Sequence, residues 1–368
     1  MATPKKNQLV GLDIGSHSIK LVEIDDSKKG MVLRNFGIVG LPHNAIVEGS
    51  IKEMDIVSLA IKNLFRNLKV NNKNIATSIS GYSVIVKKIS INKRDESELE
   101  STIHDEAEQY IPFDISDVNL DYEILSEGEE ELEEEEGKDE ERTKGEGSGM
   151  MDVMLVAAKK DIVDDYVGLL SLARLNPIVL DVDAFAIQNA FELSSGETSG
   201  GCYAIINVGA EELGINAIKN GISMFTRDSS YGGSQITEAI MSKLNVSFEE
   251  AEKIKLGGTN VDKVRGDLEE IFTSVVSSWV QEIKRALDFL STTYPNEKIE
   301  KLLISGGSIR IPGFQKYLEM ETEIPVEELN PFANLRINEK EFDPKYLSYM
   351  APQAAVAVGL ALRSVGDK

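Results

Sequence analysis

The stretch LVGLDIGSHSIKLVEID, residues Leu9–Asp25, decides the fold. An apolar, β-rich run is followed by turn residues and then by alternating apolar and polar side chains, which predicts a β-hairpin. The turn carries Asp13, Gly15, Ser16 and, just beyond it, Lys20. A phosphate chain with Mg²⁺ requires such groups: a carboxylate for the metal's waters, backbone N–H groups and a cation. On its own the stretch is equally compatible with an ordinary hairpin, because D-x-G is short and common.

The same pattern recurs about 195 residues further along the chain. Tyr203–Gly209 is an apolar strand that ends in N-x-G, with Asn207 at the first position, and Ala210 opens the turn before a returning strand. This recurrence indicates an internal duplication of an α/β core. Gly233 then precedes a predicted helix, where backbone N–H groups bind anions, although a tight turn is the commoner role of such a glycine.

Two later stretches carry candidate binding residues: one has two charged side chains on the same face of a predicted helix, and the other has glycines beside polar side chains. Glu252 and Lys255 are one turn apart on a predicted helix, where they can hold a ribose or, more simply, form an exposed ion pair. After a predicted strand, glycines would let a flat ring approach the backbone, and an arginine would stack on a purine; a purely structural strand–turn–helix is the alternative. These residues are Gly306, Gly307, Ser308 and Arg310.

Length and composition narrow the class of protein. A chain of 368 residues exceeds what one hydrophobic core fills, so two or more subdomains are expected. The net charge is -23 and no basic stripe stands out, so nucleic acid is not expected as a partner. The single cysteine excludes an internal disulfide. Neither a signal peptide nor an apolar run of membrane-spanning length occurs, which predicts a cytoplasmic protein.

The segment Glu127–Gly149 differs from the rest of the chain. Its part up to Glu146 holds twelve acidic and three basic residues. Such a segment has little apolar area to offset its ordering entropy, so a disordered loop in a β-hairpin is predicted. A tolerated, solvated insertion is the simpler interpretation, and a charged docking segment for a partner is the alternative.

Three motifs occur in a fixed order: DIGSHSIK (Asp13–Lys20), NVGAEELGI (Asn207–Ile215) and ISGGSIRIPGF (Ile304–Phe314). They resemble the phosphate-1, phosphate-2 and adenosine motifs of the actin/Hsp70/sugar-kinase ATPase superfamily. The resemblance implies an α/β, actin-like (ribonuclease H-like) fold of two halves, with an insertion in the first half similar to the 1C subdomain of FtsA. It implies subdomain 1A at 1–81 and 178–199, 1C at 82–177, 2A at 200–234 and 299–350, 2B at 235–298, and a C-terminal helix on 1A at 351–368.

Within this superfamily the chain resembles the PilM family of type IV pilus assembly proteins. The similarity covers nearly the whole chain except Glu127–Gly149, and EAEQYIPFDISDVNLDYEIL (Glu106–Leu125) is specific to PilM-like proteins. The family implies a role in pilus biogenesis and twitching motility, and binding of the cytoplasmic N-terminal peptide of PilN, a bitopic membrane protein. Its groove would lie near Tyr82–Ile91 and Tyr110–Leu125. Membrane association would come only through this partner, and self-association is a further expectation.

The resemblance also implies roles for the motif residues toward ATP and Mg²⁺. Asp13 would bind Mg²⁺ through water, and Asp183 lies where the superfamily positions the attacking water. The β- and γ-phosphates would be met by Gly15, Ser16 and Lys20 and, from the second half, by Gly209, Ala210 and Gly233. Ribose and adenine would be met by Glu252, Lys255, Gly306, Gly307, Ser308 and Arg310.

One departure from the superfamily pattern affects the expected activity. The second phosphate motif usually reads D-x-G, but position 207 is asparagine. An amide can bond a metal-bound water but lacks the charge to hold the metal firmly or to accept a proton. ATP binding with slow or absent turnover is therefore expected. The main hypothesis is a nucleotide-binding adaptor; a polymerising cytoskeletal ATPase like FtsA or MreB and a small-molecule kinase are the alternatives.

Overall fold

The computed structural model describes residues 8–28, 30–127, 149–195, 200–258 and 261–366. The chain forms two compact units: unit 1 comprises Met1–Tyr82 and Ile162–Asp367, and unit 2 comprises Ser83–Asp161. The predicted acidic loop at 127–149 lies outside the described residues except for its two end residues. No helix in the described ranges has the length and apolar character needed to cross a membrane.

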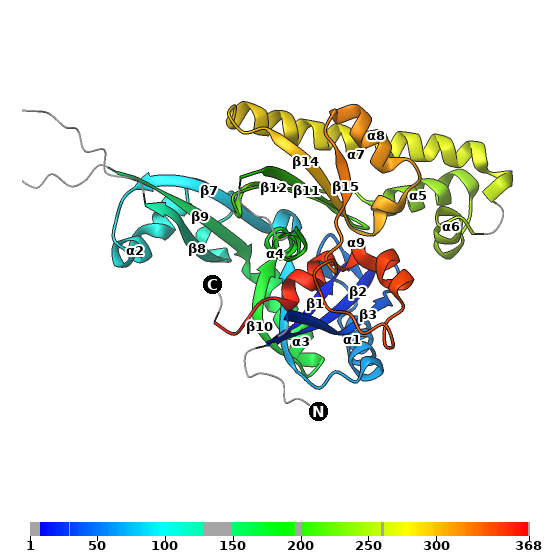
Figure 1. The fold of residues 1–368 in the computed structure, drawn as a ribbon, viewed down its shortest axis with the longest axis horizontal. Helices are drawn as coiled ribbons and strands as arrows, with labels where there is room; N and C mark the ends of the chain where they lie inside the picture. Colours follow the sequence, from blue (N-terminus) through cyan, green and yellow to red (C-terminus); the bar gives the residue numbers. More distant parts are fainter. Residues whose placement is uncertain (1–7, 29, 128–148, 196–199, 259–260, 367–368) are drawn as a thin grey trace, which may run out of the picture. The chain divides into compact units, whose positions relative to one another are not determined.

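The first sheet of unit 1 grows from the predicted hairpin. Its strand order is β10-β6-β1-β2-β3, in which β1, β2 and β3 are antiparallel and β6 and β10 run parallel to β1 (Figure 1). All five residues of β1 are buried, as expected for a central strand covered on both faces. The strands are β1 (Val10–Ile14), β2 (Ser18–Ser27), β3 (Gly30–Gly40), β6 (Asn74–Ile79) and β10 (Asn176–Val182), with the short pair β4 (Ile46–Val47) and β5 (Ser50–Ile51) after β3.

The second sheet of unit 1 has the same topology. Its order is β13-β12-β11-β14-β15, with three antiparallel strands followed by two that run parallel to β11. The duplication predicted from the recurring hairpin is therefore confirmed. The strands are β11 (Cys202–Val208), β12 (Leu213–Lys219), β13 (Ile222–Ser229), β14 (Ile299–Ser305) and β15 (Val326–Glu328).

Two helices, α4 (Asp183–Ser195) and α9 (Pro344–Ala361), lie between the sheets. Figure 1 shows α9, in red, beside β1 and β2, and the two helices pack on each other and on both sheets. Their closest approach is at Gly359, where an added Cβ would overlap the backbone carbonyl of Ala186. The small-residue composition of this helix predicts such close packing, and the structure confirms it.

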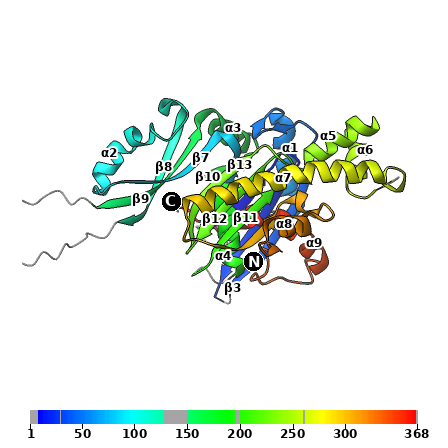
Figure 2. The same cartoon turned by 90° about the horizontal axis from the view of Figure 1, so that it is seen from above.

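Of the remaining helices of unit 1, α1, α7 and α8 pack on the sheets, while α5 packs on α6 and α7. α1 (Met54–Leu68) packs on β2 and β3. Figure 2 shows the long helix α7 lying across β11 and β12. Trp279 of α7 is fully buried, and its indole N–H donates to Gln235 over 2.9 Å. The other helices are α3 (Lys160–Leu172), α5 (Gly233–Leu244), α6 (Phe248–Lys255), α7 (Arg265–Thr293) and α8 (Phe314–Thr322).

Unit 2 is a three-stranded antiparallel sheet with one helix. The strand order is β7-β9-β8, and α2 covers the sheet over a core that includes the fully buried Leu99 and Val153. Its elements are β7 (Val84–Asn92), α2 (Glu96–Ala107), β8 (Val118–Glu127) and β9 (Met150–Lys159).

The inserted module was expected over 82–177, with the helix at 162–173 as its last element. In the structure unit 2 ends at Asp161, and α3 from Ile162 onward belongs to unit 1. The physical reason is the buried face of α3, which includes Tyr166, Leu169 and Leu170 and requires an apolar partner surface. The subdomain boundaries within unit 1 stay predictions.

Candidate functional site

The first hairpin turn holds Asp13 and Lys20 against each other. Asp13 is the penultimate residue of β1, is 8% exposed, and forms an ion pair of 3.2 Å with the ammonium of Lys20, its register partner on β2. The N–H of Gly15 donates to Ser18 across the turn. A Cβ at Gly15 would lie only 3.2 Å from the Lys20 ammonium, so glycine leaves room for that cation beside the backbone. Ser16 lies half-exposed in the same turn.

Asp183 lies close to this turn, at the start of α4. Its carboxylate accepts a hydrogen bond from the hydroxyl of Ser78, at the end of β6. Burial and the neighbouring carboxylate of Asp13 raise the pKa of Asp183 to about 7. Ser78 was not among the expected site residues; its place at the carboxyl end of an apolar strand was the available signal.

The second turn is tied to the start of α5 by backbone hydrogen bonds. Gly233 N–H donates to Gly209 over 3.1 Å, and Ser234 N–H donates to Ala210 over 2.8 Å. A Cβ at Gly232 would overlap the Ala210 carbonyl, which explains the glycine pair. The turn and the helix start therefore lie side by side as expected. The N–H of Gly233, which was expected to approach a phosphate, is therefore hydrogen-bonded to the protein's own turn in this arrangement.

Glu252 and Lys255 form an ion pair on α6 that is mostly buried rather than exposed. The Lys255 ammonium lies 2.5 Å from the Glu252 carboxylate and donates to the hydroxyl of Thr237 over 2.8 Å and to the carbonyl of Gly233 over 3.3 Å. The side chains of the pair are 14–15% exposed. The expectation of an exposed pair is therefore wrong, because α5 covers it and supplies two acceptors. Thr237, which gave no sequence signal, completes the cluster.

The third motif, after β14, reaches the second turn through one hydroxyl. Ser308 Oγ donates to the Gly209 carbonyl over 2.6 Å. Gly306 has φ +94°, and a Cβ there would overlap the Val208 carbonyl and lie 2.8 Å from Asn207 Oδ1, so only glycine fits. Gly307 lies against Gln353 of α9.

Arg310 is engaged by another side chain. Its guanidinium lies 3.7 Å above the ring of Tyr349 on α9, and its Nε is buried without a hydrogen-bond partner among the described residues. Arg310 was expected to stack on a purine, but one face of its guanidinium lies against a tyrosine of the protein itself. The opposite face stays the predicted position of a base.

Side chains from the two halves of unit 1 face each other near these motifs. His17 of the first turn lies close enough to Glu252 and Lys255 for their charges to act on it, and burial lowers its pKa. The ring of His43 stacks on Phe248 of α6, with 4.1 Å between centroids. The N–H of Glu48 donates to the carboxylate of Glu211 over 2.8 Å.

A buried carboxylate from the second turn also faces the first half. Glu212 accepts from Ser80 and from the N–H of Gly81, and burial raises its pKa, with Asp228 and Asp183 adding to the shift. Asp228 accepts from the same N–H of Gly81 over 2.9 Å. The sequence gave no sign that the charges of Glu212 and Asp183 would influence each other, because Glu212 lies in the turn after β11 and Asp183 begins α4, 29 positions earlier.

No cluster of three metal-ligating side chains occurs among the residues that the structure describes. This suits Mg²⁺, which keeps most of its waters and takes only one or two protein carboxylates together with substrate phosphates. Asp13, with Asp183 nearby, offers that type of donor. The donor set therefore fits a hydrated Mg²⁺ better than a metal held by the protein alone.

Two kinds of comparison place the chain among known proteins. The family model of the type IV pilus assembly protein PilM matches residues 11–365. The chain belongs to the PilM family. Among solved structures, the "PilM-PilN type IV pilus biogenesis complex" is similar with a TM-score of 0.82 and 26% sequence identity, over 96% of this chain and 98% of that chain.

A more distant structure supports the fold of this PilM-family chain. The ethanolamine utilization protein EutJ from Carboxydothermus hydrogenoformans matches with a TM-score of 0.57 and 14% identity, over 99% of this chain and 92% of that chain. The duplicated sheet topology and these neighbours give an actin-like fold, as the motif order predicts. This fold points to nucleotide binding.

Proposed function

We propose that this PilM-family protein is an ATP-binding adaptor of type IV pilus assembly that binds the cytoplasmic N-terminal peptide of a PilN-like inner-membrane protein. The observation that carries the proposal is the likeness over almost the full chain to a complex of PilM with PilN. The protein would be cytoplasmic and would reach the membrane through that partner. The predicted peptide groove involves Tyr82–Ile91 and Tyr110–Leu125.

The network of site residues supports ATP with Mg²⁺ as the ligand. Asp13 would hold the metal through water, while Lys20, Gly15 and Ser16 would meet phosphate oxygens from the first turn. Gly209, Ala210 and Gly233 would approach the phosphates from the second half. Around the nucleoside, the proposed contacts are Glu252, Lys255, Gly306, Gly307, Ser308 and Arg310.

The proposed adaptor role rests on weak turnover. Asn207 replaces the carboxylate expected in the second phosphate motif, and Asp183 has a pKa near neutrality, so it is only partly ionised at pH 7. Both features lower the negative charge available to orient water and metal. Contacts between the halves, such as His43 with Phe248, would respond to nucleotide and so alter the surface offered to the partner.

Titration calorimetry tests the proposal with ATP·Mg²⁺, with and without a synthetic N-terminal PilN peptide, alongside phosphate release. Micromolar ATP binding that Asp13→Asn weakens, that peptide alters, and that releases little phosphate is expected. Asp288→Asn, an exposed carboxylate on α7, is the matched control and should bind ATP normally. Absence of ATP binding removes the nucleotide from the function; rapid phosphate release contradicts the adaptor role; and ATP-dependent sedimentation points to a polymer.

A further inference from the structure

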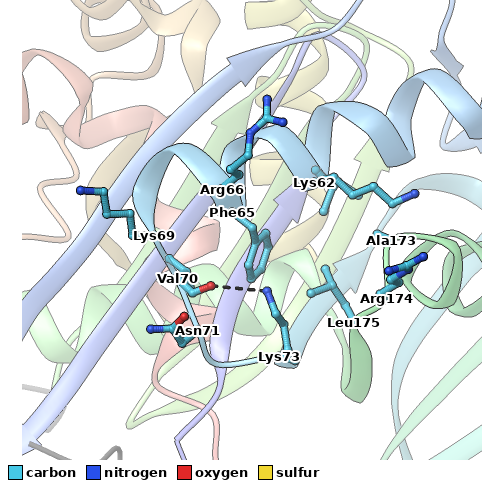
Figure 3. Close-up of a pocket in the computed structure, with 11 residues that line it drawn as sticks. Lys62, Phe65, Arg66, Lys69, Val70, Asn71, Lys73, Ala173, Arg174 and Leu175 are labelled. Atoms are coloured by element: carbon cyan, nitrogen blue, oxygen red, sulfur yellow. Dashed lines mark hydrogen bonds between the residues drawn. The ribbon is translucent and has the colours of Figure 1, made fainter.

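A concave pocket lies at the edge of the first sheet opposite to the site. It encloses about 460 Å³ between the carboxyl end of α1, the loop to β6 and the segment that follows α3. The site residues Asp13, Ser78 and Asp183 lie at or near the opposite, carboxyl ends of β1, β6 and β10. The floor is apolar and buried, formed by Ile61, Phe65, Val70, Ala173 and Leu175 (Figure 3).

The rim of this pocket is strongly basic in a strongly acidic protein. Five of its eleven lining residues are cations and none is a carboxylate, although the chain carries a net charge of -23. Within the described residues none of the five forms an ion pair. The five are Lys62, Arg66, Lys69, Lys73 and Arg174.

A role in stabilising the local fold explains only some of the five cations on the rim. Arg66 and Lys69 lie at the carboxyl end of α1, where cations complement the helix dipole. Lys73 donates to Val70 and lies 4.8 Å from the ring centroid of Phe65. Lys62 and Arg174 have no such role. Moreover, Lys69 and Arg174 have φ of 56° and 61°, a left-handed conformation that glycine or asparagine usually adopts. Backbone conformation therefore does not explain why these two positions carry basic residues.

The directions of the side chains indicate the shape of the ligand. In Figure 3 most of the outer charged ends diverge: Lys69 points to one side of the pocket, Lys62 to the opposite side, and Arg66 away from the floor. Lys73 instead points inward, to the Val70 carbonyl. A single phosphate requires donors that converge on one point. Cations that lie far apart around an apolar floor are instead complementary to an extended peptide segment. Such a segment carries several carboxylates with an apolar side chain between them.

A membrane surface fits this pocket less well. An anionic bilayer would repel a protein of net charge -23, and its flat surface would not fill a hollow floor. We infer that the pocket is a docking site for an acidic protein segment, which packs an apolar side chain on the pocket floor and pairs its carboxylates with the basic rim. This surface is separate from the nucleotide site and does not depend on the proposed function.

Fluorescence anisotropy on the full chain tests this inference with labelled synthetic peptides in which glutamates flank one or two leucines. The parent peptides should bind at low salt, and binding should fall steeply as salt is added. Replacing the leucines by serine, or the glutamates by glutamine, should each weaken binding at least tenfold. Arg66→Glu combined with Lys69→Glu should also weaken it at least tenfold.

The matched control is Lys316→Glu on α8, an exposed lysine outside the pocket that forms no ion pair within the described part of the chain. It should leave peptide affinity within about twofold, and circular dichroism melts should show all variants folded. Equal losses in the control and pocket variants would mean that only overall charge matters. Failure of every peptide to bind, or binding of phosphatidylglycerol vesicles in place of peptide, would overturn the inference.

Discussion

Asn207 occupies in the second half the position that Asp13 occupies in the first. Each residue is the penultimate one of the central strand of its sheet, and a glycine follows two positions on. The difference is chemical rather than geometric, since the side chains have almost the same size. An amide is neutral at all accessible pH values, whereas the carboxylate carries the charge that orients hydrated metal.

Asn207→Asp is therefore expected to raise the rate of phosphate release from ATP by about tenfold or more, because it restores a carboxylate beside the proposed metal. A phosphate-release assay at saturating ATP·Mg²⁺ measures the effect. The double variant Asp13→Asn with Asn207→Asp should stay slow and serves as the control. If Asn207→Asp turns over no faster than the parent, the asparagine is not what limits hydrolysis.

The carboxylate of Asp183 makes stability depend on pH. Its pKa is raised from 3.8 to about 7, chiefly by burial, so the ionised form costs stability in the folded state. This cost is absent below about pH 4, grows as the pH rises, and is complete above about pH 7. Asp183→Asn removes it while keeping an oxygen that accepts from Ser78. The variant should gain about 1–3 kcal/mol more at pH 8.5 than at pH 5 in urea unfolding. A gain that does not change with pH would contradict the shifted pKa.

The sequence could predict that these turns exist, but not how their side chains pair. Spacing alone placed Glu252 and Lys255 on one face of a helix; the burial by Thr237 depends on how α5 and α6 pack, which spacing does not encode. Arg310 was expected to face a base, and its tyrosine partner is 39 positions away on another helix. Contacts that depend on the packing of distant elements are absent from any local pattern.

At the scale of elements, the helix pair α4–α9 sets how closely the two sheets approach. Gly359→Ala should lower the free energy of unfolding by about 1–3 kcal/mol or more, because the new Cβ would overlap the Ala186 carbonyl. Urea unfolding measures it. Gly168→Ala in α3 is the matched control: nothing lies within 4 Å of its added Cβ, so the same change should stabilise by about 0.5–1 kcal/mol. Similar effects at both sites would show that the helix contact is not tight.

Most helices and strands were predictable because the hydrophobic residues of each recur with a clear helical or strand period. The hairpin expected at Leu9–Asp25 and the second hairpin expected after Tyr203–Gly209 both occur. The assignment of α3 was not predictable, since an amphipathic helix shows that it has a buried face but not which core covers that face. The basic pocket was missed for the same reason: its cations come from two segments about a hundred residues apart.

At the scale of the whole molecule, unit 2 is an insertion into a unit that is otherwise complete. Both duplicated sheets, all proposed nucleotide contacts and α3 lie in unit 1. Replacing Ser83–Asp161 by a flexible Gly-Ser linker should therefore leave ATP affinity within about threefold, by calorimetry, and should abolish binding of the PilN peptide, whose predicted groove needs this unit. Retained peptide binding would place the groove elsewhere; loss of the cooperative melt would mean that unit 1 needs the insertion to fold.

The place of α9 between the sheets has a consequence for synthesis on the ribosome. Apolar residues of the first sheet, such as Val22 and Phe36, are covered by Leu347, Met350 and Val358, which are translated more than three hundred residues later. Until these residues leave the exit tunnel, the first half cannot close its core and keeps an apolar surface exposed to other chains. Cotranslational folding of this half therefore waits until α9 has been synthesised. Nascent chains stalled before Pro344 should need a chaperone to stay soluble.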